Sequence, residues 1–172
     1  MIVKEVTFDR SRLIAGIDII ADAVRSTLGA RGRTVLIESE NHTGGITVTK
    51  DGVTVAKSIN LIDPAENLAV MMMRQAAEST ATTAGDGTTT AIVIAQAIIK
   101  VAGELITKDM NTTTILRGIQ AATKTVIDSL QSTSKKVTGK TLHSVASISA
   151  NNDTELGDII AEAYSLVGDS GV

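Results

Sequence analysis

Apolar residues recur at helical spacing in several separate segments of this 172-residue chain, and this periodicity limits the fold more than any other feature. In residues 11–28 and 115–130 the apolar positions fall three and four residues apart, which predicts amphipathic helices. A helix start signal of Asp63, Pro64 and Glu66 predicts a third helix, and the spacing within 156–167 predicts another. We therefore expect a mainly α-helical protein.

The core must be built from aliphatic side chains, because aromatic residues make up only 1% of the sequence. Helices packed on helices suit such side chains, so we expect Met71 and Met72 to fill the core. The segment 89–106 is apolar nearly all round, which predicts a central helix, and 115–130 should face the same core. With few aromatic side chains for base stacking and a net charge of −3, we expect no nucleic-acid partner.

Three short segments suggest β structure. Residues 34–38 and 46–49 are β-type runs joined by a polar loop that ends in two glycines, which predicts a hairpin. Residues 2–8 alternate apolar and polar side chains, which predicts an edge strand that needs a partner. Residues 50–52 should turn the chain after the hairpin, and the polar stretch 132–140 is typical of a hinge.

Several classes of site are excluded by the residues that are missing. The chain has no cysteine, so disulfides, thiolate nucleophiles and cysteine-based zinc sites are ruled out. Polar residues interrupt the apolar run 91–106, so we expect a buried helix of a soluble protein and no membrane partner. The first residues show no secretory or organelle signal, and we therefore expect a cytoplasmic protein.

The sharpest motif is AGDGTTTA at residues 84–91, where a loop enters the long apolar helix. Free backbone N–H groups and the positive end of the helix dipole favour an anion at such a junction. Gly85 and Gly87 would let the backbone approach a phosphate, and the Asp86 carboxylate suits Mg²⁺. The alternative interpretation is a Gly-Asp-Gly turn that only caps a buried helix.

Two further motifs carry weaker signals. In TKDG at residues 49–52, Lys50 could pair with a phosphate and Asp51 could orient a water molecule, although Asp-Gly is also common turn chemistry. In TLGARGR at residues 27–33, a glycine-rich helix exit could pack on a nucleotide, or it could be a helix cap with solvated arginines. The three motifs together favour a nucleotide or phosphate site.

These three motifs, followed by ISAN at 148–151, occur in the order found in the group I chaperonins, the Hsp60/GroEL family. The chain resembles the N-terminal part of that family from Val3 to Val172. The resemblance implies the helical bundle of a chaperonin equatorial domain, with a small hairpin and an edge strand, and the start of the intermediate domain. It places residues 1–133 in the equatorial ATP-binding domain and 134–172 in the first segment of the intermediate, or hinge, domain.

The resemblance also implies a set of site residues around ATP or ADP and Mg²⁺. Asp86 matches the metal ligand, and Asp51 matches a catalytic acidic residue that helps hydrolysis. The positions that match nucleotide contacts are Thr27, Leu28, Gly29, Lys50, Gly87, Thr88, Thr89 and Thr90.

The function implied by the resemblance is that of an ATP-hydrolysing chaperonin subunit, which assists the folding of non-native polypeptides in a ring of like subunits. It leaves open whether a co-chaperonin lid is needed, and it implies that this portion alone is inactive. The cytoplasm would be that of a bacterium, or of a host cell if the gene is viral. Two other functions stay open at this point: a stand-alone small nucleotide- or phosphate-binding protein, and an oligomer-forming structural protein without hydrolysis.

Overall fold

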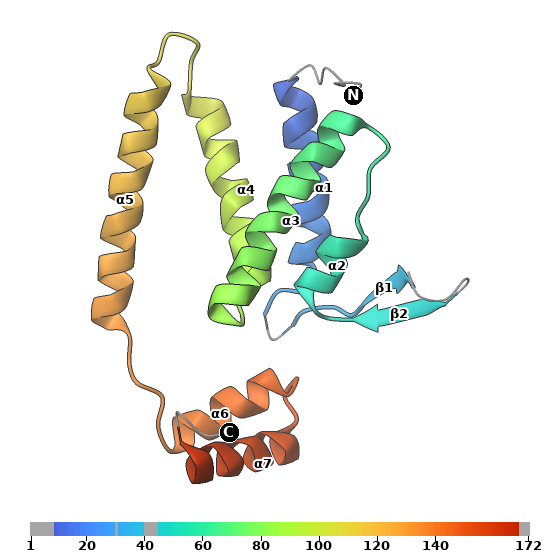
Figure 1. Ribbon diagram of the computed structural model, residues 1–172, viewed down its shortest axis with the longest axis vertical. Helices are drawn as coiled ribbons and strands as arrows, with labels where there is room; N and C mark the ends of the chain where they lie inside the picture. The colour runs from blue at the N-terminus through green and yellow to red at the C-terminus, as the bar shows by residue number, and fades with distance from the viewer. Residues whose placement is uncertain (1–8, 30, 40–44, 169–172) are drawn as a thin grey trace, which may run out of the picture. The chain divides into compact units, whose positions relative to one another are not determined.

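The computed structural model describes residues 9–29, 31–39 and 45–168. Within them the chain forms seven α-helices and one two-stranded antiparallel sheet (Figure 1). It divides into two compact units, Met1–Thr107 and Lys108–Val172. The edge strand predicted at residues 2–8 lies outside the described residues. The division of the whole protein into an equatorial part up to residue 133 and an intermediate part from 134 stays a prediction.

Four helices and the hairpin make up the first unit. In chain order its elements are α1 (Arg10–Arg25), β1 (Val35–Glu38), β2 (Ile46–Thr49), α2 (Gly52–Ser58), α3 (Pro64–Ala84) and α4 (Thr88–Leu105). Helix α3 begins where the sequence predicts, because the Asp63 carboxylate accepts hydrogen bonds from the N–H groups of Ala65 at 2.9 Å and Glu66 at 3.1 Å. Helices α1, α3 and α4 pack against one another and α2 covers one end of this group (Figure 1).

The core of the first unit is aliphatic, as the sequence predicts. Its buried members are Ile20, Ala21, Val24, Val55, Ala56, Val70, Met73, Ala77 and Ile92. The prediction that Met71 and Met72 fill it is wrong, since these side chains are 55% and 63% exposed and Met73 takes the buried position. Each residue turns an α-helix by about 100°, so neighbours of a buried position point well away from it.

Helices α1 and α3 approach each other closely at Gly16. A Cβ atom at Gly16 would lie 2.3 Å from the Glu66 carbonyl oxygen, which is closer than two non-bonded atoms can come. The missing side chain therefore sets the separation of the two helices. This close contact holds the first turn of α3 against the middle of α1.

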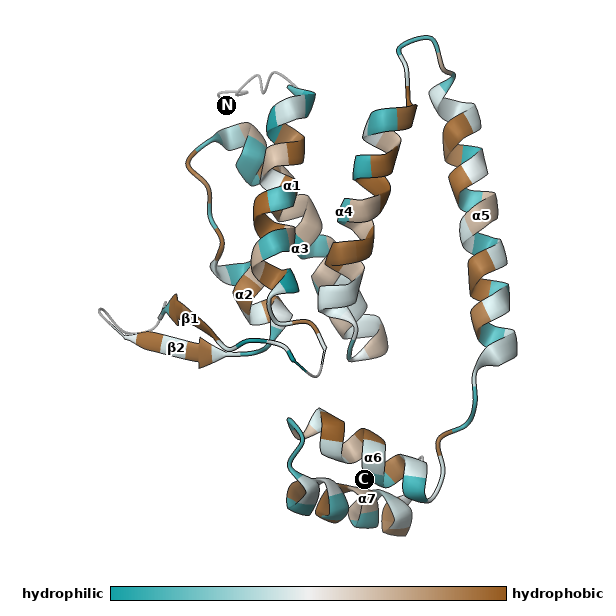
Figure 2. Cartoon of the chain, turned by 180° about the vertical axis from the view of Figure 1, so that it is seen from behind, coloured by the Kyte–Doolittle hydropathy of each residue, from teal (hydrophilic) through white to brown (hydrophobic). Residues whose placement is uncertain are grey.

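Helix α4 is not surrounded by core, contrary to the prediction for 89–106. Its buried residues are Thr88, Ile92 and Gln96, which follow one another at intervals of four on one face. Large apolar side chains on its other faces are 49–65% exposed, namely Ile94, Ile98, Val101 and Leu105. Brown bands along α4 mark this apolar character (Figure 2). Periodicity in a helix that is apolar on all sides does not indicate which face packs.

By length and composition, one helix of the described residues could cross a membrane, and it is Thr88–Leu105, of which 17% is buried. In the fold, one face of this helix packs on α1 and α3. The core helices of soluble proteins also pass this test, so it carries little weight.

The predicted hairpin is present as β1 and β2. The antiparallel register pairs Val35 with Thr49 and Glu38 with Ile46, and the Ser39 N–H donates to the Gly45 carbonyl at 2.8 Å. Lys50 and Asp51 connect β2 to α2, a helix that the sequence did not predict and that begins at Gly52. That helix has only seven residues, too few for an apolar repeat to be detected in the sequence.

The second unit contains α5 (Thr112–Thr133), α6 (Lys140–Ser149) and α7 (Thr154–Val167). Asn111 caps α5, with its side-chain oxygen 3.1 Å from the Thr114 N–H. None of its residues is buried within the second unit. Its apolar repeat therefore forms an exposed stripe. That this helix faces the core of the first unit stays a prediction.

Helix α6 was not predicted, and it packs on α7. A Cβ atom at Gly157 would lie 2.5 Å from the Ser147 Cα, so the two backbones are in close contact there. The His143 Nδ1 lies 2.9 Å from an Asp158 carboxylate oxygen and links the two helices at their surface. Helix α7 ends before Gly168 as predicted.

Candidate functional site

The motif at residues 84–91 forms a tight connection between α3 and α4. Gly85 ends α3 with φ of 74° and Gly87 precedes α4 with φ of 85°, both in the left-handed region that favours glycine. The Gly85 N–H donates to the Ala81 carbonyl at 2.9 Å, which completes the last turn of α3. The connection between the two long helices is therefore only three residues, Gly85, Asp86 and Gly87, and the two glycines make this sharp turn possible.

The N-terminus of α4 carries no side-chain cap. The side chains of Asp9, Asp51, Asp63, Asn111 and Asp153 cap the first turns of α1, α2, α3, α5 and α7. Helix α4 begins after Gly87, which offers no such acceptor. The first-turn N–H groups of a helix need a partner from outside the helix, and together with the helix dipole they attract an anion.

Asp86 is exposed, and one of its carboxylate oxygens accepts a hydrogen bond from the Gly87 N–H at 2.6 Å. Within the described ranges there is no group of three or more His, Cys, Asp or Glu side chains that could hold a metal ion. A single carboxylate suits Mg²⁺ that arrives with phosphate oxygens and water, because Mg²⁺ in phosphate sites commonly takes only one or two protein carboxylates.

The three threonines after Gly87 have different surroundings. Thr88 is 9% exposed and lies on the packed face of α4. Thr89 is half-buried and Thr90 is exposed. The hydroxyls that could face a ligand are therefore those of Thr89 and Thr90, whereas all three residues contribute backbone N–H groups.

Thr27 lies next to Thr89. Helix α1 ends at Arg25, three residues before the predicted end, and Thr27 sits in the turn that follows. Its hydroxyl donates to the Val24 carbonyl at 2.7 Å, and the hydroxyl oxygens of Thr27 and Thr89 are 3.3 Å apart. Because the single Thr27 hydroxyl proton is already used, Thr89 is the donor in this contact.

The turn that carries Thr27 is closed by backbone hydrogen bonds. The Arg33 N–H donates to the Ser26 carbonyl at 2.7 Å, and the Gly32 N–H donates to the Gly29 carbonyl at 2.9 Å. Gly29 has φ of 73°, in the left-handed region that favours glycine, and lies beyond the helix end. Leu28 is 44% exposed on the same turn, so an apolar side chain is available at the surface beside Thr27.

Asp51 is the N-cap of α2. Its carboxylate accepts hydrogen bonds from the Thr54 N–H at 2.8 Å, the Thr54 hydroxyl at 2.6 Å and the Val53 N–H at 3.3 Å. Partial burial raises the pKa of Asp51, but these hydrogen bonds and the positive charge of Lys57 more than offset it, so the pKa lies below its usual value. Asp51 is therefore an ionised acceptor at neutral pH. Lys50 is exposed immediately before it.

Gly52 and Thr54 also belong to this arrangement. Gly52 is part of the TKDG motif but was given no role in the sequence analysis, and Thr54 was missed. A Cβ atom at Gly52 would lie 2.0 Å from the Thr89 hydroxyl oxygen and 3.1 Å from Val24 Cγ1. Glycine at this position lets the start of α2 touch both α1 and α4. The three-residue spacing from Asp51 to Thr54 is a capping pattern that could have identified Thr54.

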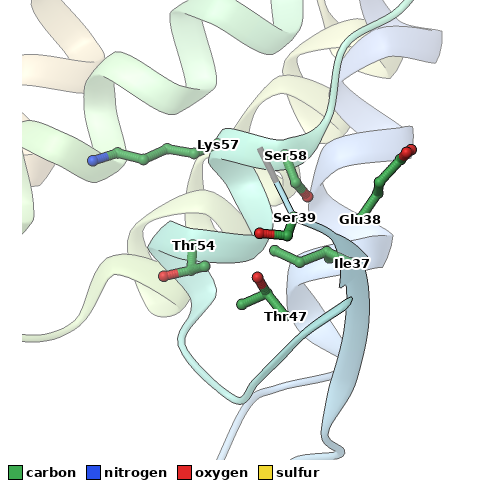
Figure 3. Close-up of a pocket in the computed structure, with 7 residues that line it drawn as sticks. All are labelled: Ile37, Glu38, Ser39, Thr47, Thr54, Lys57 and Ser58. Carbon is green, nitrogen blue, oxygen red and sulfur yellow. The ribbon is translucent and has the colours of Figure 1, made fainter. Parts of the chain in front are cut away.

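A separate pocket lies between the hairpin and α2. It is lined by Ile37, Glu38, Ser39, Thr47, Thr54, Lys57 and Ser58 (Figure 3). The Lys57 side chain extends away from this group and reaches Glu78 with 3.6 Å between its Nζ and a carboxylate oxygen. None of the site residues predicted from the sequence lines it.

The fold thus brings together one residue or loop from each of the three motifs: Thr27 after α1, Gly52 at the start of α2 and Thr89 at the start of α4. Asp86 and Gly87 precede Thr89 in the chain, and Asp51 precedes Gly52. Leu28, Gly29 and Lys50 lie in the chain beside these contact points. The convergence makes a candidate anion site, with one ionised carboxylate, Asp51, at the start of α2.

Comparison with known proteins identifies relatives of this chain. The model of the TCP-1/cpn60 chaperonin family matches residues 20–171. A crystal structure of the chaperonin gp146 from bacteriophage EL 2 (Pseudomonas aeruginosa), in the presence of ATP-BeFx, is 30% identical with a TM-score of 0.80. That match covers 94% of this chain and 28% of the phage chain. A second crystal form of gp146, also with ATP-BeFx, is 31% identical with a TM-score of 0.77 and covers 91% of this chain and 28% of that one.

Proposed function

This chain belongs to the TCP-1/cpn60 chaperonin family, and on that premise we propose that it supplies nucleotide-binding residues of an ATP-dependent chaperonin. The chaperonin fold expected from the sequence, mainly helical with a two-stranded hairpin, is confirmed. The chain spans 28% of the length of the phage chaperonin that it matches. The activity, substrates and partners of a complete chaperonin are therefore proposals for this protein.

The convergence of Thr27, Gly52 and Thr89 carries the proposal. Three motifs that are far apart in the sequence meet at the uncapped N-terminus of α4. A glycine loop that only caps a buried helix would not require the other two motifs to lie beside it. Binding of a phosphate chain does require neighbouring elements, because its oxygens take hydrogen-bond donors from several sides.

In the proposed complex, the first N–H groups of α4 and the hydroxyl of Thr90 donate to phosphate oxygens. The Thr89 hydroxyl would join them by turning its proton from Thr27 to the phosphate. Asp86 would hold Mg²⁺, which when bound neutralises phosphate charge. Leu28 and Gly29 would pack on the nucleoside, and Lys50 would meet the phosphates.

Asp51 would orient the attacking water for hydrolysis. Its carboxylate is ionised, and its two oxygens have room for further donors beyond Val53 and Thr54. Its position as the N-cap of α2 fixes the carboxylate by three hydrogen bonds before any water binds. This arrangement favours a role for Asp51 in the chemical step over one in nucleotide binding.

The proposed activity is ATP hydrolysis coupled to the folding of non-native polypeptides in a homo-oligomeric ring in the cytoplasm. The phage relative was crystallised with ATP-BeFx, which supports ATP as the nucleotide. The test uses the complete gene product: magnesium-dependent ATP hydrolysis, particle size by light scattering, and recovery of a chemically denatured enzyme with and without ATP. Assembly and refolding that do not respond to ATP would contradict the proposal and favour a structural oligomer.

A further inference from the structure

Gln96 is a polar side chain in the packed core of the first unit that the proposed nucleotide contacts do not use. It is 1% exposed and lies on α4 on the same face as Thr88 and Ile92. A buried amide costs free energy unless both of its ends are hydrogen-bonded. The partners of Gln96 therefore indicate why a glutamine occupies this position.

Both ends of the Gln96 amide are satisfied by charged side chains of α1. The Gln96 carbonyl oxygen accepts from the Arg25 guanidinium, and the Gln96 amide nitrogen donates to an Asp18 carboxylate oxygen at 2.5 Å. The same Asp18 oxygen lies 3.0 Å from the Lys100 ammonium. Arg25 and Asp18 are 50% and 32% exposed, so the network runs from the surface to the buried amide.

The position of Arg25 connects this network to the proposed site. Arg25 is the last residue of α1, and the turn that carries Thr27, Leu28 and Gly29 follows directly. Gln96 lies two helical turns after Thr89 on α4. The hydrogen bond between Arg25 and Gln96 therefore joins the end of one site element to the helix that carries the other.

We propose that Gln96 is a positioning residue, which holds the turn at residues 26–29 against α4 through Arg25 and Asp18. This inference rests on the proposed function only for its effect on nucleotide. The Thr27–Thr89 contact alone is a single long hydrogen bond of 3.3 Å between a buried and a half-buried threonine. The charged hydrogen bonds of Gln96 fix the same two elements more firmly, because hydrogen bonds to ionised groups are stronger.

Gln96→Leu in the complete gene product separates positioning from simple core packing. Leucine fills the cavity, and Arg25 and Asp18 are exposed enough to be hydrated, so we expect the melting midpoint to change by no more than about 3 °C. Amide hydrogen exchange at residues 26–29 should become faster. The dissociation constant for MgADP should rise by roughly tenfold, because a turn displaced by a fraction of an ångström loses its contacts to the nucleoside.

Two further variants sharpen the test. Lys100→Met removes the ion pair with Asp18 but leaves the Arg25–Gln96–Asp18 chain intact, so exchange at 26–29 and MgADP affinity should stay as in the wild type. The double variant Asp18→Asn with Gln96→Glu reverses the hydrogen bond between the two positions. The new amide at position 18 donates to the new carboxylate at position 96, whose other oxygen still accepts from Arg25. This double variant should restore slow exchange at 26–29, whereas Gln96→Glu alone should not.

Unchanged exchange at 26–29 in Gln96→Leu overturns the inference, whatever happens to nucleotide binding. Faster exchange throughout the first unit with a lower melting midpoint also overturns it, because that is the result of lost packing alone. A third outcome separates the two proposals. If exchange in Gln96→Leu is faster only at 26–29 but the wild-type protein does not bind MgADP, the proposed function is overturned and the positioning role of Gln96 stands.

Discussion

The hydroxyl oxygens of Thr27 and Thr89 lie 3.3 Å apart although 62 residues separate them in the chain. Thr27 follows the end of α1 and Thr89 is in the first turn of α4, so this contact joins two of the three motifs. The third motif reaches the same point through Gly52, whose Cα hydrogen faces the Thr89 hydroxyl where a Cβ would collide.

Asp86→Ala should lower magnesium-dependent ATP hydrolysis by the complete gene product by about two orders of magnitude or more, because the ion is the largest local charge on the phosphates. Asp86 is exposed and its carboxylate accepts a hydrogen bond from the neighbouring Gly87 N–H, so the fold should persist. Phosphate release and circular dichroism measure the two effects. Asp109→Ala, at another exposed loop aspartate, is the control. Normal turnover in Asp86→Ala would return the loop to a helix-capping role.

Asp51→Asn should slow ATP turnover at saturating nucleotide while MgADP still binds. Asparagine keeps an acceptor for the first turn of α2 but loses the charge that orients water. Single-turnover hydrolysis and MgADP titration separate the two steps. Asp9→Asn makes the same change at the N-cap of α1 and should leave turnover intact. A large loss of MgADP affinity with normal turnover would show that Asp51 acts in binding.

Gly52→Ala should lower both stability and nucleotide affinity. The new Cβ would lie 2.0 Å from the Thr89 hydroxyl oxygen, so Thr89 must move. Overpacking of this kind costs about 1–3 kcal/mol of unfolding free energy. Gly118→Ala on α5 is the matched control, since no atom lies within 4 Å of its Cβ position and alanine is the better helix former. Denaturant unfolding and MgADP titration give the two readouts, and equal unfolding midpoints for both variants would contradict the predicted collision.

Asp18 should contribute stability that is lost in acid. Partial burial raises the pKa of Asp18. Hydrogen bonds from Lys100 and Gln96 and the charge of Arg25 lower this pKa by more than burial raises it, so the folded pKa lies below the unfolded one. The contribution is therefore complete above the unfolded pKa of about 3.9 and falls as the pH drops through the folded pKa. Melting midpoints between about pH 6 and pH 2 should fall less steeply in Asp18→Asn than in the wild type. Parallel curves for the two proteins would show that this carboxyl group does not contribute.

The apolar stripe of α5 should make the 172-residue chain bind a hydrophobic dye. Its exposed members are Leu116, Ile119, Val126, Ile127 and Leu130, at 38–62% exposure. Contiguous apolar surface of this kind favours association. The double variant Val126→Glu with Leu130→Glu should reduce dye fluorescence and particle size by light scattering without lowering the melting midpoint, because no residue of α5 is buried. A lower midpoint would mean that the stripe is packed.

The sequence by itself determined the elements whose signals lie within a few residues. Capping residues mark two helix starts, Asp63 for α3 and Asn111 for α5. The β-type composition of two short runs marks the strands β1 and β2. The glycines of the 84–91 loop mark, within the sequence, the point where a loop enters the long apolar helix. The three motifs of the candidate site, at residues 27–33, 49–52 and 84–91, could also be recognised from the sequence alone.

Only the tertiary structure decided which faces are buried and which motifs meet. Met73 is buried and Met71 and Met72 are exposed, because the rotation of α3 against its neighbours selects one face among several apolar ones. The contacts that bring Gly52 and Thr27 to Thr89 depend on helix crossings, and glycines such as Gly16 set how closely those helices approach. Spacing in a single sequence contains no information on such crossings, since they arise from packing between segments far apart in the chain.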